Sequence, residues 1–344
     1  MKRFFAVAVY IILFGLAAFF ILSFVFPGNK LIIEKKPDSL AALGGYLEKK
    51  EEEQSKIIFV AVGDIMLDRG VEYRINREGE GDFKFPFLKI ADYLRKADIL
   101  FGNLESLISD KGRKVGSVNS FRAEPGAMEG LLFSGFDIVS VANNHFLDYT
   151  GEAMRDCFQR LKEAGVEYIG GGFNEKEAFA LKIKEVKNTK IGFLAYTNLG
   201  PRTWRAGKET IGISWTNEED LENIKSNIRE AKAGLGADIL VVSFHWGDEY
   251  MPNPNYFQTS FAKALIDEGA DLIIGHHPHV VQPVEKYKDG WIAYSLGNFV
   301  FDMGFSEETM EGLLLEVIIK DKEIQEVIPR KIKISDSFQP YLSD

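Results

Sequence analysis

The stretch KIIFVAVGD (residues 56–64) is a continuous apolar run that ends in Gly63-Asp64. A run that is apolar at nearly every position is typical of a β-strand covered on both faces. The same pattern, an apolar run followed by polar residues, returns in ADILFGNLE (97–105), DIVSVANNH (137–145), DILVVSFHWG (238–247) and DLIIGHHPH (271–279). These runs predict the central strands of the fold.

Segments with helical spacing of apolar residues separate the runs, and a strand-rich stretch, 280–334, follows them. The predicted helices span 85–97, 125–133, 151–164, 217–233 and 255–268, with further strands near 166–169 and 190–197 and a loop over 109–122. Asn217 and Asp220 are spaced as in a capping box. Strands that alternate with helices and then give way to strands predict an α/β domain with a mixed sheet or two stacked sheets.

The composition narrows the class of function. The net charge is −10, which disfavours a nucleic-acid partner because phosphate binding needs a basic face. Cys157 is the single cysteine, so disulfides are excluded, and it is remote in sequence from every histidine, which argues against a thiolate metal site.

The N-terminal segment predicts a membrane anchor. Residues 4–26 carry no charge and follow Lys2 and Arg3, and 23 helical residues at ~1.5 Å each span the ~30 Å hydrocarbon core. We therefore expect a transmembrane signal anchor over 1–27, a tether over 28–55, a folded domain over 56–334 and a tail over 335–344. The basic N-terminal end predicts a single-pass cell-membrane protein with a cytoplasmic N-terminus and an extracellular domain.

All five histidines follow apolar runs, at His145, His245, His276, His277 and His279. Taken alone, the other strand ends are consistent with a turn, a helix cap or a hydrogen-bonded core histidine, whereas the group His276, His277 and His279 favours a metal or active site by itself. Their recurrence predicts one shared site, because ligands of α/β sheets bind beyond the carboxyl ends of the strands. Asp, Glu, Asn and His donors without sulfur suit Mn, Zn or Fe. We expect the glycines before these donors to provide sharp turns.

The ordered motifs GD, GNLE, NNHxxD, HWGxEY, GHHPH and SLGNFVFD resemble the CapA/PgsA family of poly-γ-glutamate capsule biosynthesis proteins over about residues 56–305. That family is related to the calcineurin-like metallophosphoesterases. The resemblance implies stacked mixed β-sheets flanked by helices, an αββα sandwich. It also implies a site that binds one or two divalent metal ions.

The resemblance implies a role for each matching residue. The implied metal ligands are Asp64, Glu105, Asn144, His245, His277 and His279. His145, with Asp148 beside it, would be the acid for the leaving group. Supporting or substrate-contacting residues would be Asn103, Asn143, Glu249, His276 and Asn298. Arg122 and Arg202 are candidate contacts for an anionic substrate, and each is equally consistent with a plain surface charge.

Two positions depart from the phosphoesterase pattern. Met66 stands where those enzymes have a histidine ligand, and Asn103 stands where they have a bridging aspartate. Glu105, two residues further on, is a possible substitute for the aspartate. These departures favour one metal ion, or two that are weakly held.

Three functions stay open at this point. The resemblance implies a part in the synthesis or export of capsule or poly-γ-glutamate, with polymer synthetase or export proteins of the membrane as partners. The donor set also fits a metal-dependent hydrolase, a phosphoesterase or an amidase, unrelated to the polymer. A non-catalytic protein that binds the polymer or a partner, or that holds a structural metal, is the remaining alternative.

Overall fold

The computed structural model describes residues 55–115 and 119–343. The predicted anchor lies outside these residues, as does the predicted tether apart from Ser55. Within the described part of the chain, no helix combines the length and apolarity needed to cross a membrane.

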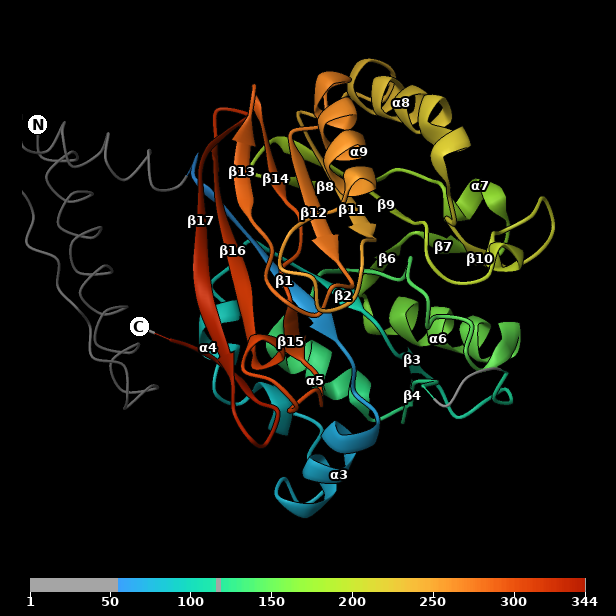
Figure 1. Cartoon of the computed structure of the whole chain (residues 1–344), viewed down its shortest axis with the longest axis vertical. Coiled ribbons are helices and arrows are strands. Elements are labelled where there is room, and N and C mark those ends of the chain that lie inside the picture. Colours follow the sequence, from blue (N-terminus) through green and yellow to red (C-terminus); the bar gives the residue numbers. More distant parts are fainter. Residues whose placement is uncertain (1–54, 116–118, 344) are drawn as a thin grey trace, which may run out of the picture. The chain divides into compact units, whose positions relative to one another are not determined.

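The larger sheet is mixed and contains the first strand of the domain at its centre (Figure 1). Its spatial order is β18 (Pro340–Leu342), β17 (Glu323–Ile334), β16 (Glu311–Lys320), β1 (Ile57–Ile65), β2 (Ile99–Leu104), β5 (Ile138–Ser140) and β6 (Glu167–Ile169), with β15 (Asn298–Val300) also paired to β1. Strands β1, β2, β5 and β6 run parallel, and β16 to β18 run antiparallel. Because β18 pairs with β17, the residues expected to form a C-terminal tail continue the sheet.

The smaller sheet has the order β13 (Val284–Tyr287), β14 (Gly290–Ala293), β12 (Leu272–His276), β11 (Ile239–His245), β9 (Thr189–Thr197) and β8 (Lys182–Val186). Its four inner strands are parallel and its two edge strands are antiparallel. Short two-stranded pairings join β3 (Leu107–Ile108) to β4 (Arg122–Ala123) and β7 (Gly171–Gly172) to β10 (Gly212–Ile213).

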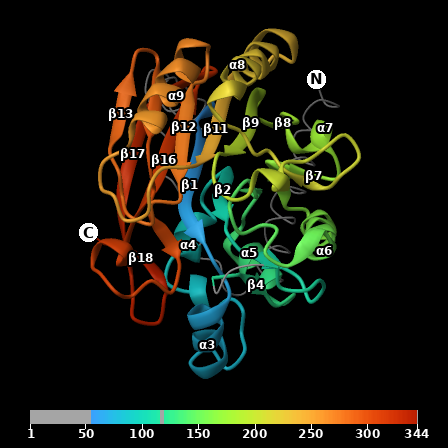
Figure 2. The same cartoon turned by 45° about the vertical axis from the view of Figure 1, so that its right-hand side comes forward.

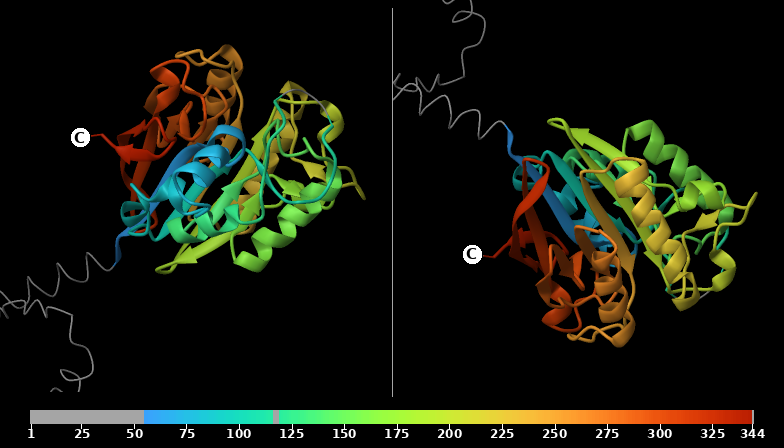
Figure 3. Two further views of the ribbon diagram at one scale, coloured as in Figure 1. Left: turned by 90° about the horizontal axis from the view of Figure 1, so that it is seen from below. Right: turned by 90° about the horizontal axis from the view of Figure 1, so that it is seen from above.

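Three apolar cores separate four layers. Between the sheets, the Phe193 ring lies against Phe59 at 5.8 Å and Phe101 at 6.3 Å, centroid to centroid. The outer face of the larger sheet packs against α3 (Arg69–Arg77), α4 (Ala91–Leu94), α5 (Ala127–Ser134) and α6 (Thr150–Ala164). The outer face of the smaller sheet packs against α8 (Leu221–Arg229) and α9 (Tyr256–Asp267), with α7 (Glu175–Ala178) near its edge (Figures 2 and 3). The prediction of stacked mixed sheets between helices is confirmed.

Some helix boundaries differ from the sequence prediction. The helix expected over 85–97 is two short pieces, a 3₁₀ turn Phe85–Phe87 and α4, and the Pro86 ring lies at the start of the first. Helix α3 was not predicted, because only Val71 and Ile75 of its nine residues are buried. Asn217 does form the predicted capping box with Asp220.

The register brings the predicted polar residues to one edge of each sheet. Asp64 pairs with Asn103 across β1 and β2, and it also pairs with Asn298 of β15. In the smaller sheet His245 pairs with His276 across β11 and β12. Because β1 and β2, and β11 and β12, are parallel pairs, their carboxyl ends present Asp64, Asn103, His245 and His276. Asn298 joins them from the first position of β15.

Candidate metal centre

Glu105, directly after β2, is the centre of the cluster. Its side chain is fully buried, and its Oε1 has no hydrogen-bond partner among the described residues. Three imidazole Nε2 atoms surround that oxygen, those of His279 at 3.7 Å and of His145 and His245 at 3.9 Å. Two ligands that each lie about 2.1 Å from one ion are roughly 3 to 4 Å apart. The spacing is therefore that of donors around a metal ion.

The loop after β12 holds two histidines in a strained backbone. His277 has φ +97° and His279 has φ +57°, which are left-handed values that non-glycine residues seldom adopt. Such strain persists where surrounding contacts impose it, and it is concentrated at functional sites. Here the backbone N–H of His277 donates to Oδ2 of Asp64 at 3.2 Å. The buried Nδ1 of His277 has no partner within the described structure.

Asn298 fixes the tautomer of His279. The amide nitrogen of Asn298 donates to the carbonyls of His279 at 3.3 Å and Thr309 at 3.0 Å, so its Oδ1 must face the imidazole. Nδ1 of His279 lies 2.9 Å from that oxygen and therefore donates its proton to it. The lone pair of His279 is then on Nε2, directed toward Glu105. A second partner that orients a ligating imidazole in this way is a regular feature of metal sites.

Asn103 presents its amino group to the centre of the cluster. Nδ2 of Asn143 donates to the backbone carbonyl of Leu104 at 2.9 Å and to Oδ1 of Asn103 at 3.1 Å, which fixes both amides. Nδ2 of Asn103 consequently lies 2.9 Å from Oδ1 of Asp64 and 3.3 Å from Oε2 of Glu105. A donor at this point occupies the position between the two carboxylates.

The same amino group sets the tautomer of His245. Nδ2 of Asn103 lies 3.2 Å from Nδ1 of His245, which must accept, so the proton of His245 is on Nε2. Nε2 in turn lies 2.7 Å from Oδ1 of Asn144 and donates to it. His245 therefore has to give up this proton before its Nε2 can bind an ion.

Asp64 already has several donors. The amino group of Asn103 and the backbone N–H of His277 donate to it. Nδ1 of His279, whose proton goes to Asn298, lies 3.4 Å from its Oδ2, which is an ion-pair distance. Nδ1 of His276 lies 3.2 Å from its Oδ1, an ion-pair distance without hydrogen-bond alignment. Burial alone would raise the pKa of Asp64, but the imidazoles of His276 and His279 outweigh it and hold that pKa well below its usual range.

His145 holds Nδ1 against a carboxylate and directs Nε2 to the centre of the cluster. Its Nδ1 lies 2.8 Å from Oδ2 of Asp148, which therefore accepts the Nδ1 proton. Its Nε2 faces Glu105 and lies 3.2 Å from the amino group of Asn144. The Phe121 ring packs on the imidazole with centroids 4.0 Å apart. The ring orientation and the tautomer are thus both fixed.

Electrostatics keep the cluster ready for a cation. Burial and the neighbouring carboxylates of Asp64, Glu249 and Asp148 raise the pKa of Glu105 well above its usual value. Burial, and then the charge of His277, lower the pKa of His245. Burial, with His279 as the next cause, lowers the pKa of His277 to about 3, so that imidazole is neutral and can act as a ligand.

The residues fit a divalent metal ion. Two groups of donors converge within 4.8 Å, Glu105 with His245 and His277, and Asp64 with Glu105 and His279. Glu105 belongs to both. A third group joins Glu249 to His277 and His279. The buried acceptors without partners, Oε1 of Glu105 and Nδ1 of His277, lie in the first group, which we regard as the better site.

The glycines serve close approach rather than sharp turns. Gly63 and Gly275 lie within β1 and β12, and neither has a positive φ. A Cβ on Gly63 would lie 2.0 Å from the carbonyl oxygen of Gly297, and one on Gly275 would lie 1.9 Å from that of Tyr294. The expectation of turns at these two positions was wrong, because each glycine lies in a strand where a neighbouring backbone carbonyl is too close for a side chain. Gly247, at φ +88°, does take a left-handed conformation after His245.

Two predicted anion contacts have other partners. The Arg122 guanidinium donates to the carbonyls of Lys111 at 2.8 Å and Gly112 at 3.4 Å and lies over the Tyr149 ring. Arg202 lies over the Trp215 ring at 5.9 Å. Met66 is buried, and its sulfur accepts from the backbone N–H of Asp68 at 3.2 Å.

Arg69, which lies near the site, could not be identified from the sequence. Its Nε donates to Oδ2 of Asp302 at 3.1 Å, and its guanidinium lies 4.6 Å from the centroid of Phe121. Its charge acts to lower the pKa of Glu105, although burial dominates. Asp302 and Tyr250 could have been found, because they stand in the motifs SLGNFVFD and HWGDEY.

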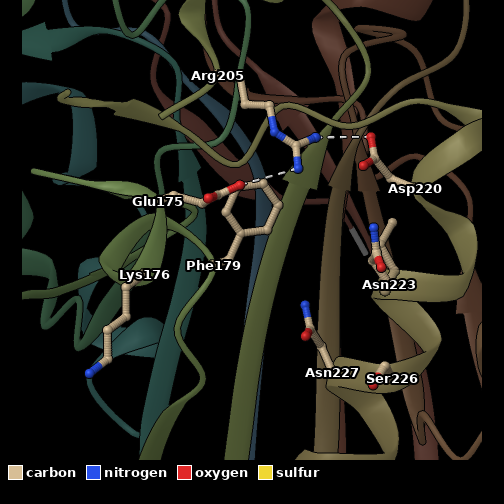
Figure 4. A pocket seen from close by; sticks show the side chains of 9 residues that line it. Glu175, Lys176, Phe179, Arg205, Asp220, Asn223, Ser226 and Asn227 are labelled. Carbon is tan, nitrogen blue, oxygen red and sulfur yellow. Dashed lines mark hydrogen bonds and ion pairs between the residues drawn. The ribbon is translucent and has the colours of Figure 1, made fainter. Parts of the chain in front are cut away.

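Besides the metal cluster, a second candidate site is a pocket of about 400 Å³ between α7 and α8, called the second pocket below. Figure 4 shows Arg205 between the carboxylates of Asp220, at 2.9 Å, and Glu175, at 3.5 Å. The guanidinium also lies 4.9 Å from the Phe179 ring centroid. None of the site residues predicted from sequence lines this pocket. The predicted site residues that lie together are those at the strand ends.

Comparison with protein families gives a match over most of the folded part. The family described as "Bacterial capsule synthesis protein PGA_cap" matches residues 58–303. The capsule biosynthesis protein CapA of Bacillus anthracis is 35% identical over 290 residues, which are 83% of this chain and 69% of that protein. The PGA biosynthesis protein CapA of Bacillus subtilis is 33% identical over 262 residues, 75% of this chain and 67% of that protein.

Solved structures give a weaker likeness. A phosphatase of Mycoplasma pneumoniae superposes with a TM-score of 0.46 at 16% identity, over 81% of this chain and 94% of that chain. The NAD nucleotidase of Haemophilus influenzae gives a TM-score of 0.45 at 10% identity, over 84% and 60% of the two chains. Likeness at this level does not transfer an activity.

Proposed function

The chain belongs to the bacterial capsule synthesis family PGA_cap, and on that premise we propose that it is a membrane-anchored, extracellular component of capsule or poly-γ-glutamate synthesis or export that carries a metal-dependent phosphoesterase centre. One observation carries the catalytic part. Oε1 of Glu105 is buried without a hydrogen-bond partner in the described structure, within 3.9 Å of three imidazole nitrogens. A buried polar atom without a partner is costly unless a ligand completes it.

The proposed chemistry is hydrolysis of a phosphate monoester to an alcohol and inorganic phosphate. A divalent ion, when bound, supplies a Lewis acid for the phosphoryl group and lowers the pKa of water. Glu105, His277, His245 and Asn144 would hold that ion, with His279 beside them. The oxygen of water forms the new bond to phosphorus as the bond to the leaving oxygen breaks.

His145 would transfer the proton that the leaving oxygen needs. Its Nδ1 is held by Asp148 at 2.8 Å, so Nε2 is the atom that can carry a proton toward the substrate. Protonation of the leaving group by a positioned side chain contributes about 10² to 10⁴ in rate. Asp148 has a positioning role, since it fixes the ring rather than touching the substrate.

The experiment is phosphatase activity of the full chain in detergent with Mn²⁺, compared with His145→Ala and His277→Ala. We expect His277→Ala to lose both bound metal and activity. His145→Ala should keep the metal and lose about 10² in kcat. Leu235→Ala, at a half-exposed position remote in sequence from the cluster, is the matched control. Wild-type protein without stoichiometric metal, or His277→Ala with full activity, would sink the proposal.

A second candidate, a non-catalytic binding component, is favoured by the amino group of Asn103. This donor holds Asp64, Glu105 and His245 together without a cation. On this alternative the full chain would bind no metal, and deletion of its gene would still abolish surface polymer. The metal content of the wild-type chain separates the two candidates.

A further inference from the structure

A groove of about 530 Å³ begins at the histidine loop of the metal centre. Val280 and Val281 line it and directly follow His279 in the chain. Tyr250 also lines it, with its ring centroid 6.3 Å from that of His279 and its backbone N–H donating to the carbonyl of Pro278 at 2.8 Å. The groove therefore lies beside the histidine loop of the metal centre.

Part of the groove lining is aromatic and exposed to solvent. The Phe305 ring meets Tyr250 edge to face, with centroids 5.2 Å apart. Phe305 is 65% exposed and Tyr250 42% exposed. The segment that carries Phe305 is tied to the histidine loop, since Asn298 donates both to the carbonyl of Thr309 and to that of His279. Large exposed apolar groups beside a polar centre mark a binding surface.

The charge of the groove opposes an anionic polymer. Its charged lining residues are Glu308 and Glu311, and no lysine or arginine lines it within the described parts of the chain. Glu311 is paired with Lys331 at 3.3 Å, which leaves the carboxylate of Glu308 uncompensated by a lining residue. A poly-γ-glutamate segment carries one carboxylate per residue, so like charges would meet there.

We propose that this groove binds the uncharged, apolar alcohol side of the substrate, so that the substrate class is a phosphate monoester of an aryl or branched alkyl alcohol rather than a segment of an anionic polymer. This inference rests on the proposed function, because it assigns the other half of the substrate of the same centre. The phosphoryl group lies at the cluster, and the alcohol carbon skeleton lies against Val281, Tyr250 and Phe305.

The test is equilibrium binding of two non-hydrolysable analogues to the full chain in detergent with Mn²⁺. Phenylphosphonate should bind about tenfold more tightly than methylphosphonate, as expected if roughly 60 Å² more apolar surface leaves water. Phe305→Ala should reduce this preference to about twofold and leave methylphosphonate unchanged. Phe173→Ala removes an exposed aromatic ring outside the groove and is the matched control.

Several outcomes overturn the assignment. These are equal affinity for the two phosphonates, no measurable binding of either, an equal effect of Phe173→Ala, or a poly-γ-glutamate oligomer that displaces phenylphosphonate at lower concentration. Turnover of phenyl phosphate and methyl phosphate separates the two proposals. If binding depends on Phe305 but neither ester is hydrolysed, the phosphoesterase proposal fails and the assignment of the groove stands. If both esters are hydrolysed equally well, the phosphoesterase proposal stands and the assignment of the groove fails.

Discussion

Asn103 is the residue whose chemistry most affects the metal centre. Its amino group donates toward Asp64 and Glu105, and it fixes His245 with the proton on Nε2. A carboxylate at this position would accept from Nδ1 of His245 instead. The Nε2 lone pair would then be free for a metal ion. Asn103 is thus expected to weaken metal binding rather than to support it.

The first prediction is that Asn103→Asp binds Mn²⁺ about 10 to 100 times more tightly than wild type, because the orientation of ligating imidazoles by a neighbouring carboxylate has effects of this size. Without metal the variant should have a lower Tm, since three buried carboxylates would face one another. Titration calorimetry of the full chain measures the affinity, and Asn223→Asp at the second pocket is the control. Unchanged or weaker binding would show that Asn103 does not control the centre.

Sequence reasoning located the donors but not their hydrogen-bonding states. The strand-end positions of Asp64, Glu105 and the histidines could be predicted, because each follows an apolar run. The orientation of Asn103 could not, because it depends on Asn143 and on the carbonyl of Leu104. Arg69 was missed for the same kind of reason, since its partner Asp302 is 233 residues away in the chain.

At the scale of elements, the first turn of α3 concentrates negative charge. Glu72 lies near Asp68 and Glu124, and burial, followed by these two carboxylates, raises its pKa from 4.5 to about 7. A carboxyl group with a raised folded-state pKa binds its proton more tightly when folded. Its contribution to stability is therefore present below pH 4.5 and is lost as the pH rises through about 7.

The second prediction follows from this linkage. Glu72→Gln should raise the Tm at pH 8 by about 2 °C, and the gain should shrink as the pH is lowered to 4. The side chain is partly exposed, so solvent screening keeps the effect small. Thermal unfolding at both pH values measures it, with Glu129→Gln on α5 as the control. A gain that is the same at pH 4 and pH 8 would contradict the assignment.

The third prediction concerns the close contact of Gly275 in β12 with the backbone carbonyl of Tyr294, the residue that follows β14. Gly275→Ala should lower the free energy of unfolding by about 3 kcal/mol, because its Cβ would meet a backbone carbonyl that cannot move aside. The Cβ of Gly234→Ala meets only the Glu230 side chain at 3.4 Å, so this control should change stability by less than about 0.5 kcal/mol. Denaturant unfolding compares them, and equal effects would mean that β12 can shift to accommodate the methyl group.

These elements also show where strand and helix prediction from sequence succeeds. The inner strands could be predicted because they are apolar throughout, as covered parallel strands are. Helix α3 could not, since its buried stripe is only Val71 and Ile75. The requirement for glycine at position 275 could not be predicted from sequence, because it depends on the neighbouring carbonyl of Tyr294.

At the scale of the whole molecule, the proposed function combines an anchor with an extracellular centre. The fourth prediction is that the full chain sediments with membranes and that removal of residues 1–27 releases an intact, soluble domain. A protease added to intact cells should cleave the anchored protein, because the domain is expected outside. Membrane association that persists without residues 1–27 would show that another part of the chain makes the attachment.

The family match and the groove both bear on the proposed role of this protein. Membership of the PGA_cap family connects the chain with capsule synthesis, whereas the acidic, apolar groove argues against direct contact of the polymer with the metal centre. A small apolar phosphoester is compatible with both. The central claim is therefore the metal centre itself.

The most direct measurement is anomalous X-ray diffraction at the manganese edge from crystals of the protein grown with Mn²⁺. We predict one strong peak per chain between Oε1 of Glu105 and Nδ1 of His277, with Asn144 and His245 completing the contacts, and no such peak in His277→Ala. A wild-type crystal without a peak at Glu105, or with a peak that persists in His277→Ala, would contradict the account.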